Sequence, residues 1–409
     1  MTPTAHRSPL IPLDDALATL LAYAVPLAAF ESVSTFDADG RILAQDAVSP
    51  LQVPSFDNSA MDGYAMRCAD VADAALPVSQ RIAAGSAPEP LQPGTVARIF
   101  TGAPLPVGAD AVVMQEECAV QPDGTLRVLR PPLPGQCVRR AGEDVAKNAV
   151  VLSKGERLTP ASIALAASIG MDLLSVARRP RVALFSTGDE LVMPGDVAPQ
   201  DMRPGAIYNS NRFFLRALLQ RMGCVVTDLG IVPDQRDATV DALRVASQSH
   251  DLILTSGGVS VGEEDHVKAA VQALGSLHLW QLAIKPGKPF AYGTVAGSHF
   301  IGLPGNPVAS FVTFLLLVRP FVLRLQGATA VEPPAMQLPA HFDWPRADKR
   351  REFLRVRRNS EGGLDLFANQ SSGVLTSAAW ADGLVDTRPG QTIGWGDTVR
   401  FLPLAELQA

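Results

Sequence analysis

The sequence predicts a multidomain α/β protein: a central α/β domain with a parallel-type sheet, an all-β insertion domain and a smaller C-terminal β domain. Three observations support this fold class. Strand-length apolar runs alternate with amphipathic helical segments from about residue 181 to 325, which is typical of a parallel sheet covered on both faces. Short β-type runs separated by Gly and Pro turns fill residues 41–138, and β-type runs return after about residue 328. The 409 residues allow roughly two to four domains.

Two helices are predicted on either side of the insertion. Residues 14–21 carry apolar side chains at helical spacing behind an acidic start. Residues 158–169 repeat this pattern, with Thr159 as a side-chain cap and Pro160 at the first helical position. Because residues 41–138 between them read as strands and turns, the insertion interrupts a helical region.

The central region alternates strands with helices. We predict, in chain order, strand 182–185, helix 209–222, strand 225–232, helix 238–246, strand 251–254, helix 266–274, strand 300–303 and helix 308–325. Ligands of parallel sheets bind beyond the carboxyl ends of the strands. The loops after Phe185, Leu254 and Leu303 are therefore the first places to look for a site.

Short β-type runs at residues 353–356, 392–393 and 398–402 predict a terminal β domain. The same region holds a basic run: Arg346, Lys349, Arg350, Arg351, Arg355, Arg357 and Arg358. RNA binding would need exposed aromatic side chains among these cations, and only Trp344 and Phe353 are near. We interpret the run as a solvated β edge.

Composition excludes several functional classes. Hydrophobic residues make up 47% and charged residues 19% of the chain, which excludes disorder as the main state. The net charge of -6 argues against nucleic-acid binding. The four cysteines lack C-x-x-C spacing, so no zinc or redox site is indicated and a reducing compartment is favoured. Because no signal-peptide layout is present and no apolar stretch reaches the ~18–20 residues of a membrane span, we predict a soluble cytoplasmic protein without membrane contact.

Two Gly-rich turns follow predicted strands directly, at residues 186–191 (STGDEL) and 255–262 (TSGGVSVG). Such turns direct backbone N–H groups toward an anion, so phosphate binding and simple chain reversal are both open interpretations. Glu190 follows the first turn and Asp265 follows the second. Carboxylates beside a phosphate site indicate a bridging cation such as Mg²⁺, although Asp265 is equally placed to cap the helix that follows it.

Other loops carry polar groups among small residues and prolines. The string KPGKP holds Lys285 and Lys288, which either attract a phosphate or are ordinary surface lysines. The string GLPGNP at 302–307 is either a ligand loop or a structural turn before a helix. Asp62 and Thr101 lie in loops of the insertion that, taken alone, are interpreted as turns.

Together, these strings resemble the molybdopterin molybdenumtransferase family, which also includes the C-terminal part of gephyrin. The matching strings are NSAMDGYA at 58–65, FTGAPLP at 100–106, RAGEDV at 140–145, STGDEL at 186–191, TSGGVSVG at 255–262 with Asp265, KPGKPFAYG at 285–293 and GLPGNPV at 302–308. They run in family order across most of the chain. Each is a moderate signal alone, and jointly they are highly specific.

The resemblance implies an activity, a fold and an assembly. The family inserts molybdate into adenylylated molybdopterin and releases AMP, which implies those two substrates and Mg²⁺ as the cofactor. The implied domains are a discontinuous helical domain at 1–48 and 141–177, a β-rich insertion at 49–140, an α/β molybdopterin-binding domain at 178–327 and a C-terminal β domain at 328–409. The family forms an elongated homodimer whose cleft lies between the α/β domain of one subunit and the insertion of the other. The pathway's adenylyltransferase is a further candidate partner.

The resemblance also implies roles for individual residues. Asp62, Thr101, Asp144, Glu190 and Asp265 match catalytic positions, and Glu190 and Asp265 would also hold the metal. A second set matches positions that bind the cofactor or shape its pocket: Gly188, Asp234, Ser256, Gly257, Gly258, Lys285, Lys288, Pro304, Pro307 and Ser372. The surroundings of Asp234 depart from the family pattern, and Asp382 stands where Asn is usual.

Two alternatives are a neighbouring enzyme of the same pathway and a protein of another functional class. A molybdopterin adenylyltransferase would need only the α/β domain and would leave the β insertion unexplained. A non-catalytic scaffold similar to gephyrin's terminal part would use the same fold to bind a partner peptide, and the intact set of acidic residues and lysines disfavours it.

Overall fold

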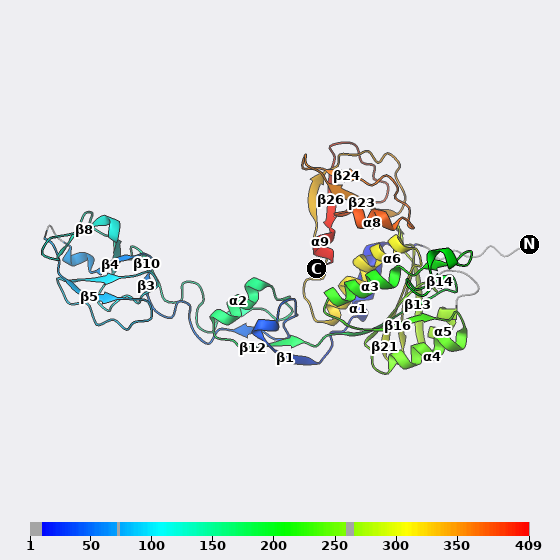
Figure 1. Ribbon diagram of the computed structural model, residues 1–409, viewed down its shortest axis with the longest axis horizontal. Coiled ribbons are helices and arrows are strands. Elements are labelled where there is room, and N and C mark those ends of the chain that lie inside the picture. The colour runs from blue at the N-terminus through cyan, green and yellow to red at the C-terminus, as the bar shows by residue number, and fades with distance from the viewer. Residues whose placement is uncertain (1–9, 72–73, 259–265, 409) are drawn as a thin grey trace, which may run out of the picture.

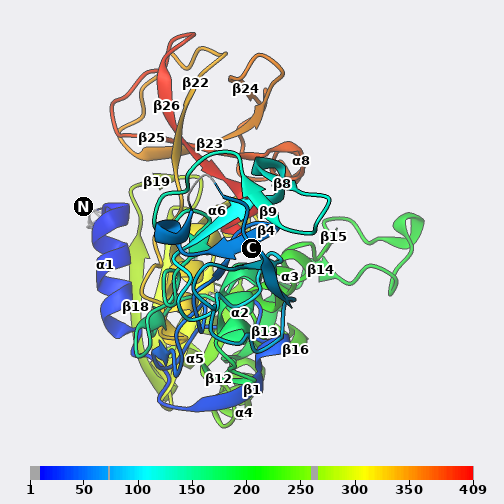
Figure 2. The same cartoon turned by 90° about the vertical axis from the view of Figure 1, so that its left-hand side faces the viewer.

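The computed structural model describes residues 10–71, 74–258 and 266–408. The molecule is elongated, with the β insertion at one end and the α/β and C-terminal domains at the other (Figure 1). A small segment that contains α2 (Pro160–Ser168) lies between them. Seen along the long axis, the C-terminal β domain rises as a separate layer from the α/β domain (Figure 2).

The α/β domain is built on a six-stranded sheet in the order β16-β13-β17-β21-β20-β18. Its strands are β13 (Arg181–Thr187), β16 (Val225–Val232), β17 (Leu252–Ser256), β18 (Gly275–Gln281), β20 (Pro289–Val295) and β21 (Ser298–Leu303). The predicted parallel arrangement is confirmed for β16, β13, β17 and β21. β20 and β18 add an antiparallel edge that the sequence pattern did not predict, because a hairpin and not a helix joins β20 to β21.

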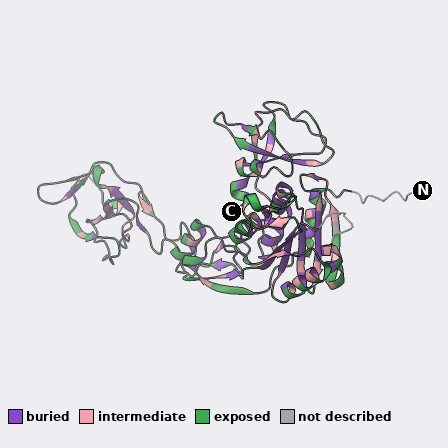
Figure 3. Cartoon of the chain, turned by 45° about the vertical axis from the view of Figure 1, so that its right-hand side comes forward, coloured by how far each residue is buried: buried purple, intermediate pink, exposed green. Residues whose placement is uncertain are grey.

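Helices cover both faces of this sheet, as predicted (Figure 1). One layer holds α3 (Asn211–Arg221) and the helical segment Pro307–Leu325; the other holds α4 (Arg236–Ser247) and α5 (His266–Leu274). Side chains of β13 alternate between the layers: Val182 and Leu184 join one core cluster, and Ala183 and Phe185 join the other. The strands β13, β17 and β21 in the middle of the sheet are mostly buried between the layers (Figure 3).

The segment Pro307–Leu325 is long and apolar enough to cross a membrane, but 94% of its most apolar window is buried inside the protein. It comprises α6 (Pro307–Thr313), a π-helical stretch at Phe314–Val318, and α7 (Arg319–Leu325). The helix α1 (Leu13–Tyr23) packs against it, with Leu13 and Leu20 in the same core cluster. The helix α1 therefore packs against the α/β domain.

The insertion contains a four-stranded sheet in the order β5-β6-β4-β7. Its strands are β4 (Gly63–Met66), β5 (Val78–Ile82), β6 (Val96–Ile99) and β7 (Ala111–Met114), and short pairs join β3 (Asn58–Ser59) to β10 (Val138–Arg139) and β8 (Cys118–Val120) to β9 (Leu126–Val128). Ala65, Ile99 and Val112 are buried in its own core cluster.

Chain segments before and after the insertion pair with each other. β1 (Phe30–Ser34) is antiparallel to β12 (Leu173–Ala177), and β2 (Ala47–Val48) is antiparallel to β11 (Val150–Leu152). The helix α2 starts as predicted, because the Thr159 hydroxyl accepts a hydrogen bond from the Ser162 N–H at 3.2 Å and Pro160 takes the first position. Two adjacent, paired chain segments therefore connect the insertion to the rest of the protein.

The C-terminal domain is a sheet in the order β19-β23-β25-β26-β22, with β24 paired to β23. Its elements are β19 (Ile284–Lys285), β22 (Met336–Pro339), β23 (Arg351–Arg358), β24 (Leu364–Leu366), α8 (Leu375–Trp380), β25 (Gly383–Thr387), β26 (Thr398–Pro403) and α9 (Leu404–Leu407). Because β19 comes from the KPGKP loop and pairs in parallel with β23, the sheet also ties the α/β domain to the C-terminal domain.

The basic run does not form the solvated edge that the sequence predicted. β23 is an interior strand, and Arg355 on it is only 1% exposed. Its guanidinium donates hydrogen bonds to Ser377 Oγ at 3.2 Å and to the Phe353 carbonyl at 3.0 Å, and burial lowers its pKa to about 10. Arg351 is held by Asp386, with Nε 2.6 Å from Oδ1. Cations alone could not show that this strand lies between two others.

Candidate functional site

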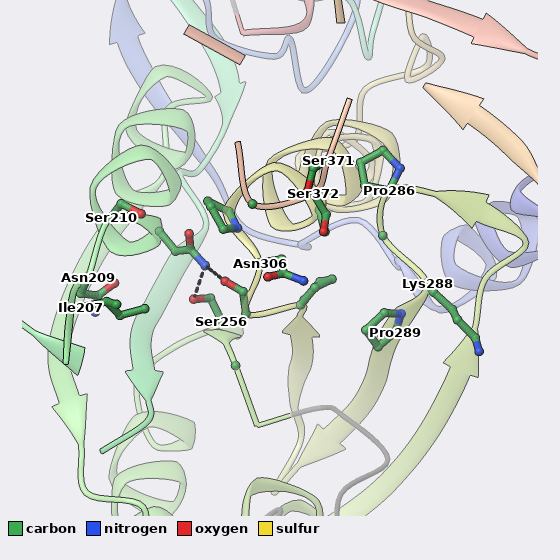
Figure 4. Close-up of a pocket in the computed structure, with 18 of the residues that line it drawn as sticks. Ile207, Asn209, Ser210, Ser256, Pro286, Lys288, Pro289, Asn306, Ser371 and Ser372 are labelled. Atoms are coloured by element: carbon green, nitrogen blue, oxygen red, sulfur yellow. Dashed lines mark hydrogen bonds between the residues drawn. The ribbon is translucent and has the colours of Figure 1, made fainter. Parts of the chain in front are cut away.

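A polar pocket of about 800 Å³ lies where the loops after β13, β17 and β21 meet, at the carboxyl ends of the strands (Figure 4). The strand order predicted these loops. Residues 285–289 close one side of the pocket, and residues 370–373 of the C-terminal domain close another. The predicted site residues that line it are Glu190, Ser256, Gly257, Lys285, Lys288, Pro304, Pro307 and Ser372.

The Gly-rich turn after β17 needs glycine, both for its backbone conformation and for its close packing. Gly258 has a φ of +65°, and a Cβ there would lie 2.4 Å from Val267 Cγ2 on α5. Gly257 donates its N–H to the Leu303 carbonyl at 3.0 Å, which fixes the turn to β21. Asp265, predicted as a catalytic and metal-binding residue, lies outside the described residues.

The buried side chain of Asn211 joins two of the pocket loops. Its Nδ2 donates to the Gly305 carbonyl at 2.7 Å and to Ser256 Oγ at 3.2 Å (Figure 4). On the opposite wall, the Val308 N–H at the start of α6 donates to the Ser372 carbonyl at 2.9 Å. The loop 302–307 is thereby held between α3 and the C-terminal domain, which makes the pocket a rigid interdomain site.

The two lysines of the pocket differ in their electrostatic surroundings. Lys285 Nζ lies 2.8 Å from Oε1 of the buried Glu352 and 3.7 Å from Asp348 Oδ2. Lys288 is exposed and makes no ion pair within residues 10–71, 74–258 and 266–408. Lys288 is therefore the lysine whose charge is available to an anion in the pocket, and Lys285 is largely compensated.

Arg350 adds a third cation to the pocket wall. Its Nη2 lies 3.0 Å from Asp348 Oδ2. The hydrogen bonds from Arg350 and the nearby charge of Lys285 lower the pKa of Asp348 to about 2. Asp348 and Glu352 thus anchor the cations on one wall, and neither carboxylate lines the pocket itself.

Glu190 is the acidic side chain that the described residues contribute to the pocket lining. It folds back over its own turn, because a Cβ built on Gly188 would lie 2.6 Å from Glu190 Oε2. Within the described residues no group of three or more His, Cys, Asp or Glu could hold a metal ion. A cation here would combine Glu190 with oxygens of a bound ligand, which is how Mg²⁺ commonly binds beside phosphates.

Asp62 and Thr101 form a hydrogen-bonded pair in the insertion, far along the molecule from the pocket (Figure 1). Asp62 Oδ1 accepts from the Thr101 N–H and from the Thr101 hydroxyl, both at 2.8 Å, and these bonds lower the pKa of Asp62. Arg98 supports the pair: it donates to the Gly63 carbonyl at 3.2 Å and stacks on Phe100, 4.8 Å from the ring centroid.

Four other predicted residues also lie outside the pocket lining: Gly188, Gly258, Asp144 and Asp234. Asp144 is exposed in the linker after the insertion, where its N–H donates to the Val53 carbonyl at 3.1 Å. Asp234 follows β16 at the carboxyl edge of the sheet and is half-buried. The pocket of one chain therefore brings together one of the predicted catalytic residues, Glu190, and most of the predicted cofactor-binding residues.

The structure adds pocket residues that sequence reasoning missed: Tyr208, Asn209, Ser210, Asn211, Asn306, Arg350, Gln370 and Ser371. Asn209 to Asn211 fall at the start of the predicted helix 209–222 and carry no Gly-rich signal, so the helical pattern did not mark them as site residues. Arg350 was grouped with surface cations. The string N-S-N at the carboxyl side of a short strand could have indicated a polar loop.

Three family models match the chain in succession. The MoeA N-terminal region (domain I and II) matches residues 11–170, a probable molybdopterin binding domain matches 183–324, and the MoeA C-terminal region (domain IV) matches 337–404. Together they span nearly all of the described chain, including the insertion, the pocket loops and the C-terminal wall.

Curated relatives and a solved structure agree with these matches. The molybdopterin molybdenumtransferase of Haemophilus influenzae is 44% identical over 80% of this chain and 80% of its own length. That of Nostoc sp. is 38% identical over 91% of this chain and 88% of its own. The crystal structure of the molybdopterin biosynthesis moeA protein from Pyrococcus horikoshii OT3 is 28% identical, covers 97% of this chain and 100% of that chain, and superposes with a TM-score of 0.85.

Proposed function

The chain belongs to the MoeA family of molybdopterin molybdenumtransferases, and on this premise we propose that it inserts molybdate into adenylylated molybdopterin and releases AMP. The observation that carries the proposal is the polar pocket at the carboxyl ends of β13, β17 and β21. It combines a Gly-rich turn, an uncompensated lysine and one carboxylate. Such a pocket suits a ligand with several phosphate charges.

The reaction requires charge neutralisation and positioning more than a side-chain nucleophile. Cleavage of the pyrophosphate releases AMP, and the attacking group is a molybdate oxygen or water. Lys288 would bind the phosphate oxygens, beside the Gly257 turn that closes this part of the pocket. Lys285 and Arg350, held by Glu352 and Asp348, would keep the surrounding potential positive without moving toward the ligand.

Magnesium fits this site as a cation held by few protein ligands. Glu190 would hold it together with phosphate oxygens of the substrate, and Asp265 is the second predicted ligand. When bound, the ion would neutralise charge that develops on the leaving phosphate. The carboxylate of Glu190 could take this role, because it forms no ion pair with a cation of the described residues.

A homodimer would complete the site. Asp62 and Thr101 belong to the insertion, which lies at the end of the molecule opposite to the α/β domain (Figure 1), and Asp144 lies in the linker next to the insertion. We therefore infer that they act at the pocket of another subunit. In this arrangement the insertion of one subunit closes the pocket of the other. We place the protein in the cytoplasm, where the pathway's adenylyltransferase could deliver the substrate directly.

The proposal is tested by product formation with the purified full-length protein. We expect the protein to release AMP, measured by chromatography, when adenylylated molybdopterin, molybdate and Mg²⁺ are supplied together. Much less AMP should be released when Mg²⁺ is replaced by a chelator. The product should activate a molybdenum enzyme that lacks its cofactor. Absence of AMP release under the complete conditions would refute the proposed activity.

A further inference from the structure

A second polar cavity, of about 1000 Å³, lies between the start of α1 and the C-terminal β domain. We call it the cationic cavity, because positively charged side chains outnumber carboxylates in its lining. Its charged residues are Lys349, Arg351, Arg388, Arg400, Asp14 and Asp386. The whole chain carries a net charge of -6, so this excess of positive charge is local. A cleft lined by one sign of charge concentrates ions of the opposite sign, and this one should attract anions.

The cationic cavity is distinct from the polar pocket. Arg350 lines the polar pocket, whereas its two neighbours in the chain, Lys349 and Arg351, line the cationic cavity. Successive side chains of extended backbone point to opposite sides, and this alternation separates the two linings where β23 begins. The two cavities share no lining residue among those that the structure describes. An anion in the cationic cavity would therefore leave the proposed reaction site unoccupied.

Two arginines of the cavity are fixed by the carboxylate of Asp386, which is only 6% exposed. Arg351 donates from Nε to Asp386 Oδ1 at 2.6 Å and from Nη2 to Oδ2 at 2.7 Å. Arg400 donates from Nη1 to the same Oδ2 at 3.2 Å, and Arg351 Nη1 donates to Asp14 Oδ1 at 2.8 Å. The guanidinium groups are thus oriented before any ligand arrives, and preorganised groups lose little conformational entropy on binding.

The other two cations lack a carboxylate partner. Lys349 and Arg388 are exposed, and neither side chain forms an ion pair with a residue of 10–71, 74–258 or 266–408. The loop that carries Arg388 is nevertheless held in place. The Gly390 N–H donates to the Asp348 carbonyl at 2.8 Å, and the Arg388 N–H donates to Gln391 Oε1 at 3.0 Å. Lys349 and Arg388 therefore bring two uncompensated charges to a cavity whose arginines are already ordered.

We propose that the cationic cavity is a second anion site, which binds a small ligand with at least two adjacent oxyanion groups, either phosphates or carboxylates. Two uncompensated cations match two negative charges, and the arginine forks suit planar or tetrahedral oxyanions. The amide and hydroxyl groups of Gln337, Gln391 and Thr398 line the same cavity and add hydrogen-bonding capacity. This assignment gives Lys349 of the basic run a binding role, and it does not depend on the proposed activity.

Calorimetric titration of the full-length protein with inorganic pyrophosphate counts the two sites. We expect two pyrophosphates per chain in the wild type, one in each cavity. The double variant Lys349→Met/Arg388→Met should weaken one of them by on the order of tenfold, because two charge-assisted contacts are lost. Lys288→Met should weaken the other and leave the cationic cavity as it is. Titration with citrate in the Lys288→Met background then distinguishes a carboxylate ligand from a phosphate ligand.

Arg346→Met is the matched control, because Arg346 is an exposed arginine of the same basic run and lines neither cavity. It should bind two pyrophosphates as the wild type does. The substituted positions are exposed, so the fold should persist, and circular dichroism checks it. Unchanged pyrophosphate binding in the Lys349→Met/Arg388→Met variant would overturn the second site, as would a single wild-type site that Lys288→Met weakens. Neither result would affect AMP release by the wild-type protein, which tests the proposed activity separately.

Discussion

The polar pocket of the α/β domain gathers its charges from three distant segments, whereas the Asp62–Thr101 loop of the insertion fixes one carboxylate by local bonds. In the pocket, Lys285 and Arg350 are held by Glu352 and Asp348, and only Lys288 is left for an anion. In the insertion, both hydrogen bonds to Asp62 come from a single residue, Thr101. The pocket is organised to bind, and the loop is organised to present one oriented carboxylate elsewhere.

The largest effect should follow from removing a carboxylate of either region. We expect Asp62→Ala and Glu190→Ala each to lower turnover by on the order of 100-fold while the fold is kept, because in the proposed dimeric site each removes a charge beside the reacting phosphate. AMP release measures turnover, and circular dichroism checks the fold. Near-wild-type turnover in both variants would remove these residues from the site.

Mixing the two inactive variants tests whether the regions meet between subunits. Random exchange should restore about a quarter of wild-type activity, because mixed dimers keep one intact pairing of pocket and insertion. Subunit exchange between two preparations of the Asp62→Ala variant is the control, and it should restore no activity. If the mixture stays inactive after subunit exchange has been verified, the insertion does not serve the pocket of a partner subunit.

The two lysines should separate binding from stability. Lys288→Met should weaken pyrophosphate binding by about tenfold without changing the free energy of unfolding, because its charge has no described partner. Lys285→Met leaves the buried Glu352 with fewer partners: among the described residues, the indole N–H of Trp344 is the side-chain donor that remains, at 2.9 Å. We expect it to lower the free energy of unfolding by about 1 kcal/mol. Urea unfolding and calorimetry provide the two readings, and identical behaviour of the two variants would contradict this division of roles.

The sequence predicted the pocket better than the insertion site, for physical reasons. Strand periodicity located β13, β17 and β21, and their shared carboxyl edge brings Glu190, Ser256 and Pro304 together without further information. Arg350 and Ser371 reach the pocket through the pairing of β19 with β23, which is a long-range contact that no local pattern shows. For Asp62 a local pattern predicts a turn, and only the family resemblance gives it a role.

A smaller effect, on the pKa of Asp62, is expected from replacing Arg98. Arg98 supports the Asp62–Thr101 loop but makes no hydrogen bond to the Asp62 carboxylate. Arg98→Met removes its bond to the Gly63 carbonyl and its stacking on Phe100, next to Thr101. The pKa of Asp62 should rise, because the N–H and hydroxyl of Thr101 are held less firmly and a nearby positive charge is lost. Carbon NMR of the carboxylate measures the shift. Arg127→Met, an exposed arginine of the same domain, should leave it unchanged.

The smallest effect concerns how much the Asp348 carboxylate, which holds Arg350, contributes to the free energy of unfolding as the pH falls. Asp348 has a pKa of about 2 in the folded protein against an ordinary value of 3.8, so its ionised form stabilises the fold. This contribution is complete above pH 3.8 and is lost as the pH falls toward 2. Because the Asp348 side chain remains partly solvated, the loss should stay within about 1 kcal/mol. Asp348→Asn should therefore be slightly less stable than wild type at pH 6, and the difference should shrink as the pH falls through that window. Urea unfolding at several pH values measures it, and a difference independent of pH would show that Asp348 contributes through packing and not through its charge.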